Sequence, residues 1–316
     1  MDKPIIFMFS GQGSQYYQMG RKLFQHNPTF RKWMVVIDDF VRRKIGSSVI
    51  DEIYNPKNRA EEPFVRTLFT SPAIFMVEYS LAQVLLEGGV EPGYLLGASL
   101  GEFIAATLSG VLGMEECVDY LLKQAETLEH CCKNSSMLTI VASPDLYYKD
   151  PQLFAETEIA SINFHSHFVI SGKNEKIAEI SGFLKGREII SLCLPVSFGF
   201  HSSWIDPAAP ICRDFLKTIS FHKPEIPLIS CLSGTELTGI PENYFWDVVR
   251  KPVQFQQTLQ ELERKAAYFY LDLGPSGTLA TFTKYNLKPD SSSSFQAIMT
   301  PFHQELKNLQ KILDQV

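Results

Sequence analysis

A serine between two glycines gives the clearest chemical signal in this sequence. Ser99 lies in Gly97-Ala98-Ser99-Leu100-Gly101, directly after the apolar run Tyr94-Leu95-Leu96 and before the helix-forming residues 102–106. A strand, a sharp turn and a helix in this order form a nucleophile elbow, with the serine hydroxyl exposed at the tip. The glycines permit the strained turn, and the free N–H groups at the helix start can stabilise an oxyanion. The pattern therefore predicts nucleophilic catalysis by Ser99.

A serine hydroxyl needs a base to take its proton, and seven histidines are available. His201 follows a predicted strand within Ser197-Phe198-Gly199-Phe200-His201-Ser202-Ser203, where an imidazole would face a cleft, and we predict that it is the base. The other six lie in polar segments that we expect to be exposed or flank a predicted turn: His26, His130, His222 and His303, and His165 and His167.

The third member of a catalytic triad is not evident. No carboxylate follows Ser99 at a strand end, as the Ser, Asp, His order of α/β-hydrolases requires, unless Asp145 or Asp150 is recruited. A main-chain carbonyl can also fix the imidazole tautomer. A dyad of Ser99 and His201 is therefore the alternative to a triad.

A second glycine-rich turn lies near the start of the chain. Gly11-Gln12-Gly13-Ser14-Gln15 follows the apolar strand Ile5 to Phe9, so its backbone amides can face a ligand. A dinucleotide-binding G-x-G-x-x-G starting at Gly11 would need a third glycine where Tyr16 stands. We therefore set that interpretation aside.

The elements around these turns predict an α/β fold. Helical patterns cover residues 28–46 and 114–131, and a further helix opens at Ser71-Pro72. Residues 133–198 follow the order strand, helix, strand, strand, helix, strand, which is typical of a ferredoxin-like domain. We predict a discontinuous α/β-hydrolase-like domain (residues 1–132 and 199–316) with a mostly parallel sheet, into which the small domain (residues 133–198) is inserted.

Composition limits the partners. At 316 residues, 45% hydrophobic and 20% charged, the chain has the composition of a packed globular protein. The net charge of -6, without blocks of like charge, argues against nucleic acid. The start lacks a signal peptide, and no uninterrupted apolar run approaches the ~20 residues that cross a bilayer, so we expect a cytoplasmic protein without a membrane partner. The six cysteines have no C-x-x-C spacing, so we expect no metal site.

Taken together, the motifs resemble the malonyl-CoA:acyl-carrier-protein transacylases and the acyltransferase domains of polyketide synthases. The similarity covers essentially the whole chain and rests on three ordered motifs: Gly11 to Gln15, Gly97 to Glu102, and Phe200-His201-Ser202. It also includes Asn163 and the segments Phe168 to Gly172, Lys251 to Phe255, and Leu273-Gly274-Pro275.

The resemblance assigns roles to residues of this chain. It implies that Ser99 is acylated, that His201 is its base, and that the backbone amides of Gln12 and Leu100 hold the oxyanion. A main-chain carbonyl in the loop around Val248, before Pro252, would orient His201. The resemblance also implies that Asn163 binds substrate.

Several positions depart from the family pattern. Malonyl-specific members have an arginine that pairs with the substrate carboxylate where this sequence has Gln124, and glutamine cannot make that charge-assisted contact. Ala98, Ser10 and Ser71 stand where histidine, proline and glutamine are usual. The aromatic side chains near the base, Phe198 and Phe200, further favour an uncharged acyl group.

These departures, on a stand-alone chain, resemble the acyl hydrolases of trans-acyltransferase polyketide synthases, particularly the bacillaene-cluster type. The resemblance implies an enzyme that removes acetyl and other short non-malonyl acyl groups from the phosphopantetheine arm of acyl carrier proteins. We expect a monomer that needs no cofactor. A transacylase for malonyl or another acyl group is the alternative. A catalytically inactive carrier-protein docking module is a third hypothesis, which requires Ser99 or His201 to be misplaced.

Overall fold

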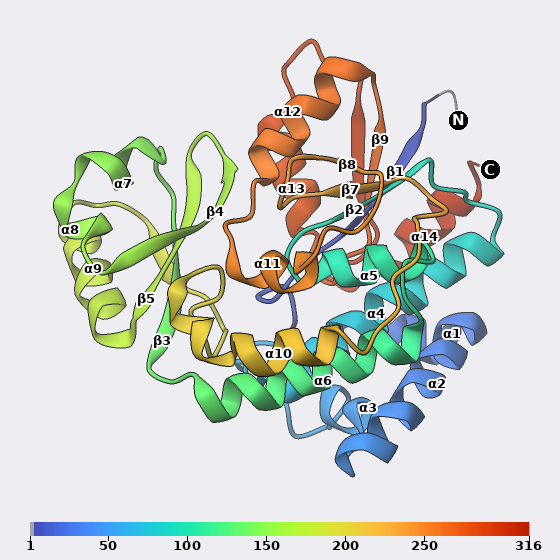
Figure 1. Ribbon diagram of the computed structural model, residues 1–316. Coiled ribbons are helices and arrows are strands. Elements are labelled where there is room, and N and C mark those ends of the chain that lie inside the picture. Colours follow the sequence, from blue (N-terminus) through green and yellow to red (C-terminus); the bar gives the residue numbers. More distant parts are fainter. Residues whose placement is uncertain (1–2, 316) are drawn as a thin grey trace.

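The computed structural model describes residues 3–315 and has a six-stranded sheet at its centre (Figure 1). Five of the strands run parallel, and β8 at one edge is antiparallel to its neighbour. From edge to edge they are β10 (Ser294–Ala297), β9 (Phe269–Asp272), β1 (Ile5–Phe9), β2 (Tyr94–Gly97), β7 (Leu228–Ser230) and β8 (Thr235–Leu237). The predicted mostly parallel sheet is confirmed.

Helices cover both faces of this sheet because its central strands are apolar on both sides. In β1, Phe7 and Phe9 pack into the larger core cluster, while Ile6 and Met8 pack into a second cluster on the opposite face. The larger cluster is built with α1 (Arg21–His26), α2 (Pro28–Ile45), α3 (Val49–Ile53), α4 (Thr67–Glu87), α5 (Gly101–Leu108) and α6 (Met114–Cys131). The second is built with α12 (Phe255–Lys265) and α13 (Thr278–Asn286).

Helix α4 is buried along most of its length. By length and composition it could cross a membrane, but 89% of its most apolar window is buried inside the protein, as in a core helix. It begins at Thr67, not at Ser71 as the sequence predicted, because Leu68 and Phe69 extend its apolar side by one turn. Pro72 is tolerated in the second turn, where its missing N–H costs one helical hydrogen bond.

The small antiparallel sheet lies beside the large one (Figure 1). Its strands run in the order β4 (Thr157–Phe164), β5 (His167–Lys173), β3 (Ser135–Ile140) and β6 (Ser191–Cys193). With α7 (Asp145–Lys149), α8 (Pro151–Phe154) and α9 (Asn174–Gly186), they follow the predicted ferredoxin-like order. The strands lie within the predicted range 133–198, whose exact limits stay a prediction.

Strand alternation gives the small sheet two different faces. Leu138 and Phe168 pack with α9 into the core of the small domain. Met137 and Val169, which alternate with them, belong instead to the core cluster of the large domain. The second face of the small sheet therefore forms a wall against the large domain.

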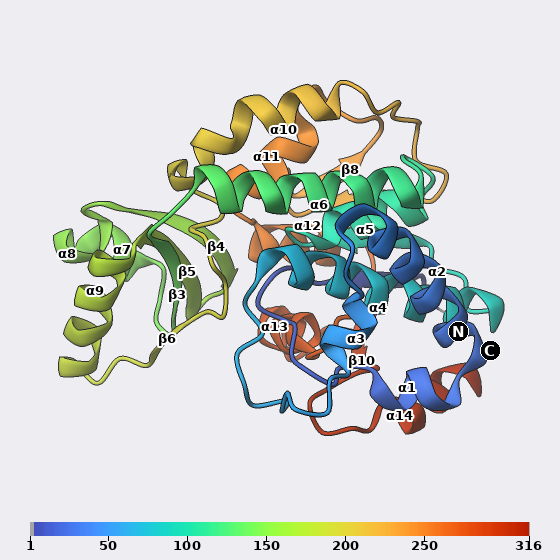
Figure 2. The same cartoon turned by 90° about the horizontal axis from the view of Figure 1, so that it is seen from below.

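Four further elements complete the fold. They are the 3-10 helix η1 (Ser203–Ala208), α10 (Ala209–Leu216), α11 (Tyr244–Arg250) and α14 (Glu305–Leu313). Figures 1 and 2 both show α10 alongside α6. Sequence patterns did not predict η1, α10, α11 or the edge strands β8 and β10. These elements are too short to show a clear hydrophobic periodicity in the sequence, and tertiary contacts stabilise them.

A substitution at Gly101 tests the close packing of α5 on β1. A Cβ at this position would lie 2.0 Å from the Phe9 carbonyl oxygen, so we expect Gly101→Ala to lower the free energy of unfolding by at least about 3 kcal/mol. Gly182 in α9 has no atom within 4 Å of such a Cβ, so Gly182→Ala should stabilise the protein by about 0.5–1 kcal/mol. Urea denaturation measures both; a Gly101→Ala midpoint equal to that of the wild type would contradict the packing argument.

Candidate active site

Ser99 lies at the tip of a strained turn between β2 and α5. Its φ of 56° is in the left-handed region, which residues other than glycine rarely adopt. The glycines on both sides are required by contact: a Cβ at Gly97 would lie 2.3 Å from Glu102 Cα, and one at Gly101 would meet Phe9. The turn has the geometry of a nucleophile elbow.

His201 lies within hydrogen-bond distance of Ser99. Ser99 Oγ is 2.8 Å from His201 Nε2, and His201 Nδ1 is 2.8 Å from the carbonyl oxygen of Lys251. Since a carbonyl only accepts, Nδ1 carries the proton and Nε2 is left to accept the Ser99 proton. The arrangement is a dyad in which a main-chain carbonyl takes the place of a carboxylate.

The structure corrects two expectations about this third group. The orienting carbonyl belongs to Lys251, the residue directly after α11, whereas Val248 lies inside that helix. Asp145 and Asp150 are not recruited: they pair with Lys149 and Arg187 in the small domain. A carbonyl at the end of a helix is free to accept a side-chain hydrogen bond because it has no partner one turn further on.

Burial keeps His201 neutral. The side chain is almost completely inaccessible, and this loss of hydration lowers the pKa of His201 to about 4, although the Lys251 carbonyl acts in the opposite direction. A neutral imidazole can accept a proton from a serine hydroxyl, whereas an imidazolium cannot. His201 is therefore present in the form that a general base requires.

The backbone around His201 is held from both domains. His201 itself has a left-handed φ of 59°, and its N–H donates to the Val249 carbonyl at 2.8 Å. Ser171 of the small sheet donates from Oγ to the Phe200 carbonyl at 2.5 Å, and the Gly199 N–H donates to Ser135 Oγ at 2.9 Å. Such a strained residue persists only because its surroundings fix it.

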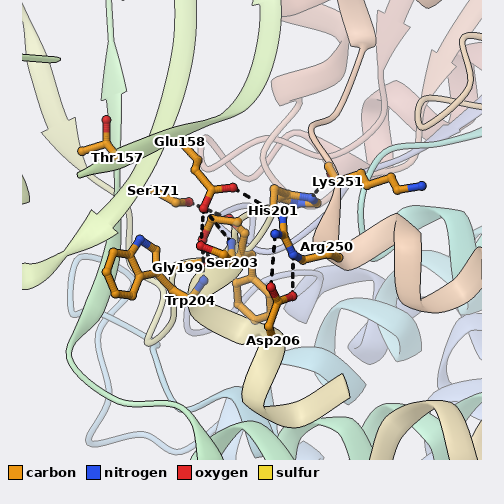
Figure 3. A network of polar contacts seen from close by, with 12 residues as sticks. Thr157, Glu158, Ser171, Gly199, His201, Ser203, Trp204, Asp206, Arg250 and Lys251 are labelled. Atoms are coloured by element: carbon orange, nitrogen blue, oxygen red, sulfur yellow. Dashed lines mark hydrogen bonds and ion pairs between the residues drawn. The ribbon is translucent and has the colours of Figure 1, made fainter. Parts of the chain in front are cut away.

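An ion-pair network reinforces this position (Figure 3). Arg250, the residue before Lys251, contacts Asp206 of η1 through Nε at 2.5 Å and Nη2 at 3.2 Å. Its Nη1 lies 3.4 Å from Glu158 of β4, which also accepts the Ser203 N–H at 2.9 Å. The network joins the small sheet, the segment after His201 and the end of α11, which supplies the orienting carbonyl.

Glu102 connects the elbow helix α5 to α11. It is buried in the first turn of α5 and accepts hydrogen bonds from the Tyr244 hydroxyl in α11 and from the Leu232 N–H. Burial raises the pKa of Glu102 to about 7, against the effect of these donors. The helix that follows Ser99 and the helix that precedes Lys251 are thus tied together.

The Gly11–Ser14 loop lies against the elbow. A Cβ at Gly11 would be 2.8 Å from Ser99 Cβ and 3.3 Å from the Leu100 nitrogen. The Gln12 side chain is fixed by α4, since its Oε1 accepts from Thr70 at 2.9 Å and its Nε2 donates to Ser71 at 2.8 Å. Between residues 3 and 315, neither the Gln12 N–H nor the Leu100 N–H donates to another group, so both are available to an oxyanion.

A cavity of about 270 Å³ opens over the dyad between the two domains. Six of the nine predicted site residues line it: Gln12, Ala98, Ser99, Asn163, Phe200 and His201. Most other lining side chains are apolar: Met137, Val169, Leu194, Val253, Phe255, Leu279 and Phe282. The lining, taken from the described residues, includes no lysine or arginine.

The other three predicted residues lie outside this lining. Leu100 is relevant only through its backbone N–H. Gln124 is buried in α6 and donates from Nε2 to the Tyr120 hydroxyl at 3.0 Å, so it does not reach the cavity. Phe198 packs behind Phe200, with the ring planes at 89°. Neither Gln124 nor Phe198 lines this cavity, and their assignment as substrate-binding residues stays a prediction.

The small sheet adds polar groups that the sequence analysis did not identify. His167, Thr139 and Ser161 line the cavity with Asn163. His167 Nε2 is 2.9 Å from Thr139 Oγ1 and Nδ1 is 3.0 Å from Asn163 Nδ2, while burial lowers the pKa of His167. The period of two along β5 placed His167 on the same face as Val169, but only the tertiary structure shows that this face meets the cavity.

No metal site is evident: the described residues 3–315 hold no cluster of three or more His, Cys, Asp or Glu side chains that could bind a metal ion.

Comparison with known proteins identifies the family. The family model described as "Acyl transferase domain" matches residues 6–315. The chain belongs to this acyl transferase family. Among its relatives, it is 48% identical over 312 residues to the polyketide biosynthesis acyltransferase homolog PksD of Bacillus subtilis, covering 99% of this chain and 96% of that protein. It is 49% identical over 316 residues to the homolog BaeD of Bacillus velezensis, covering 100% and 98%.

Solved structures share the acyl transferase fold. A loading acyltransferase of the avermectin polyketide synthase matches with a TM-score of 0.88 at 23% identity, over 98% of this chain and 99% of that one. The malonyl CoA-acyl carrier protein transacylase of Clostridium perfringens matches with a TM-score of 0.81 at 24% identity, over 99% and 96%. This α/β fold with a small antiparallel sheet is therefore shared with these acyltransferases. The relationship to PksD and BaeD places the chain among acyltransferase homologues of polyketide biosynthesis.

The burial of His201 predicts an acid limit for Ser99 reactivity. An exposed histidine would lose its base form below about pH 6.5, whereas burial moves this transition to about pH 4. We expect the rate at which a fluorophosphonate probe labels Ser99 to stay constant as pH falls through 6.5 and to drop only near 4. Circular dichroism at each pH verifies that the protein is folded. A midpoint near 6.5 would contradict the assignment.

Loss of the Arg250 network should slow the reaction without weakening substrate binding. In Arg250→Ala the end of α11 loses its ties to Asp206 and Glu158, so the Lys251 carbonyl shifts and His201 is less well oriented. We expect kcat to fall roughly tenfold with KM unchanged, because misplaced catalytic groups lower the rate of the chemical step. Arg264→Ala, which removes an exposed i,i+3 ion pair with Glu261, is the control and should leave both constants unchanged. Equal effects of the two substitutions would disprove the positioning role.

Proposed function

We propose that this acyl transferase family member is an acyl hydrolase that releases short, uncharged acyl groups, such as acetyl, from phosphopantetheine thioesters on the acyl carrier proteins of a polyketide synthase. The acyl group would pass through Ser99 to water. The observation that carries this proposal is the lining of the cavity, which brings no cationic side chain near the Ser99–His201 dyad.

The first half-reaction acylates the serine. Ser99 Oγ attacks the thioester carbonyl carbon while His201 Nε2 takes its proton. The negative charge on the carbonyl oxygen is stabilised by the N–H groups of Gln12 and Leu100, and the Lys251 carbonyl holds the imidazolium through Nδ1–H. The C–S bond then breaks, and His201 returns the proton to the phosphopantetheine sulfur.

The second half-reaction uses the same groups. His201 Nε2 takes a proton from a water molecule, whose oxygen attacks the acyl carbon of acyl-Ser99. The ester C–O bond breaks, the proton passes from His201 to Ser99 Oγ, and a carboxylic acid leaves. Only the acceptor distinguishes this hydrolysis from transfer to a thiol, so one dyad serves either outcome.

Electrostatics supports the choice of an uncharged acyl group. A malonyl carboxylate entering this cavity would lose hydration, and a charge-assisted hydrogen bond that could compensate is worth about 1.5–3 kcal/mol. His201 and His167 are both neutral because burial lowers each pKa, so neither offers a positive charge. Gln124, at the position where malonyl-specific members have arginine, bonds to Tyr120 instead. Acetyl and butyryl groups have no carboxylate to dehydrate, so they can contact Met137 and Val169 without this loss of hydration.

Carrier proteins loaded with acetyl, butyryl or malonyl groups test the proposal. Mass spectrometry should show release of acetyl and butyryl at least about tenfold faster than malonyl, since 1.4 kcal/mol corresponds to a factor of ten. Ser99→Ala should abolish release, while Ser47→Ala on an exposed loop should not change it. Fast malonyl transfer from coenzyme A without acetyl release would instead identify a transacylase. A folded protein whose Ser99 does not react with a fluorophosphonate would be a docking module.

A further inference from the structure

A buried carboxyl group lies beneath the loop that carries Gln12. Glu78 belongs to α4, is completely inaccessible to solvent, and takes no part in the reaction described above. Both of its oxygens accept from the Ser10 N–H, at 3.2 Å and 3.1 Å. Among residues 3–315, no lysine, arginine or histidine forms an ion pair with it.

Three hydroxyl contacts continue from Glu78 into the loop. Ser10 Oγ is 2.5 Å from Glu78 Oε1 and 2.8 Å from Ser14 Oγ, and Ser14 Oγ is 2.8 Å from the Gly11 carbonyl. The two hydroxyls supply only two protons for these three contacts, and a carboxylate supplies none. A carboxylic acid supplies the third: Glu78 donates to Ser10, Ser10 to Ser14, and Ser14 to Gly11.

We propose that Glu78 is a positioning residue that, as a neutral carboxylic acid, fixes the oxyanion loop through Ser10 and Ser14. The proposal rests on the acyl-Ser99 chemistry proposed above, because the Gln12 N–H matters only if an oxyanion forms at Ser99.

The electrostatic surroundings agree with a neutral acid. Complete burial raises the pKa of Glu78 well above its ordinary value, and the buried carboxylate of Asp272 raises it further, although the Ser10 donors act in the opposite direction. Asp272 is satisfied by the N–H groups of Gly274 and Ala280, both at 2.8 Å, and does not share the Glu78 proton. With no cation nearby, the uncharged form costs least.

The same helix holds the loop at a second point. Thr70 and Ser71, about two turns before Glu78 in α4, form hydrogen bonds with the Gln12 side chain. Helix α4 therefore contacts both ends of the segment from Ser10 to Gln12. Between these two contacts, Gly11 lies too close to Ser99 to accommodate a Cβ. A shift of Ser10 therefore changes the distance between the Gln12 N–H and the carbonyl that Ser99 attacks.

The pairing is specific to the residue at position 10. A proline at this position would have neither an N–H nor a hydroxyl to offer a carboxyl group. Ser10 supplies both, and without Glu78 its buried N–H would have no partner, at a cost of about 1–3 kcal/mol. Ser10 and Glu78 therefore act as a unit.

Substitutions along this chain of hydroxyls test the proposal. Glu78→Gln keeps the shape and can donate to Ser10 Oγ while accepting its N–H, so kcat should stay within about threefold of the wild type. Glu78→Leu and Ser14→Ala should lower both kcat on acetyl-loaded carrier protein and the rate of fluorophosphonate labelling of Ser99, roughly tenfold or more, with KM unchanged. The matched control is Ser80→Ala on the same helix, since Ser80 Oγ is buried without a hydrogen-bond partner in the described structure.

The outcomes separate this inference from the proposed function. Labelling of Ser99 that is equal in wild type, Glu78→Leu and Ser14→Ala overturns the positioning role, and a Glu78→Gln variant as slow as Glu78→Leu overturns the neutral acid. If Glu78→Leu does not fold, Ser14→Ala decides, because it leaves the contact between Glu78 and Ser10 in place. A wild type that labels normally but releases no acetyl contradicts only the proposed hydrolysis.

Discussion

The parallel pairing of β1 with β2 is the constraint on which the site depends. Phe9 and Gly97 are register partners, and the Ala98 N–H continues the ladder by donating to the Phe9 carbonyl at 2.9 Å. The carboxyl ends of adjacent parallel strands lie at the same edge of a sheet, so the loop after β1 and the elbow after β2 leave it side by side. Gly11 then contacts Ser99 without room for a Cβ, which brings the Gln12 and Leu100 amides to one place.

The candidate base, His201, comes from a distant part of the chain, and its strained backbone has to be fixed by neighbouring groups. His201 combines a left-handed φ with almost complete burial, and both cost free energy. Its position is fixed by Ser171 from the small sheet, by Val249 and Lys251 at the end of α11, and by the ion pairs of Arg250 (Figure 3). The small domain is therefore part of the catalytic geometry as well as a wall of the cavity.

What could be predicted from the sequence was the part encoded locally. The elbow depends on consecutive residues, and the ferredoxin-like order depends on strand and helix periodicity. Both are therefore found in the structure as predicted. The Lys251 carbonyl could not be assigned, because every residue has a carbonyl and only the end of α11 leaves this one free. The orientation of Gln124 and the access of His167 to the cavity depend on packing between segments far apart in the sequence.

Selectivity in such a site follows from what burial does to charge. The apolar wall that lowers the pKa of His201 also removes the hydration that a substrate carboxylate would need. A fixed cation in the cavity would compensate for this loss of hydration, but it would also stand close to His201 and lower its pKa further. Without such a cation, the same apolar cavity would favour the uncharged acyl group that we propose as the substrate. The neutral His201 and the proposed preference for an uncharged acyl group would thus both result from one apolar environment.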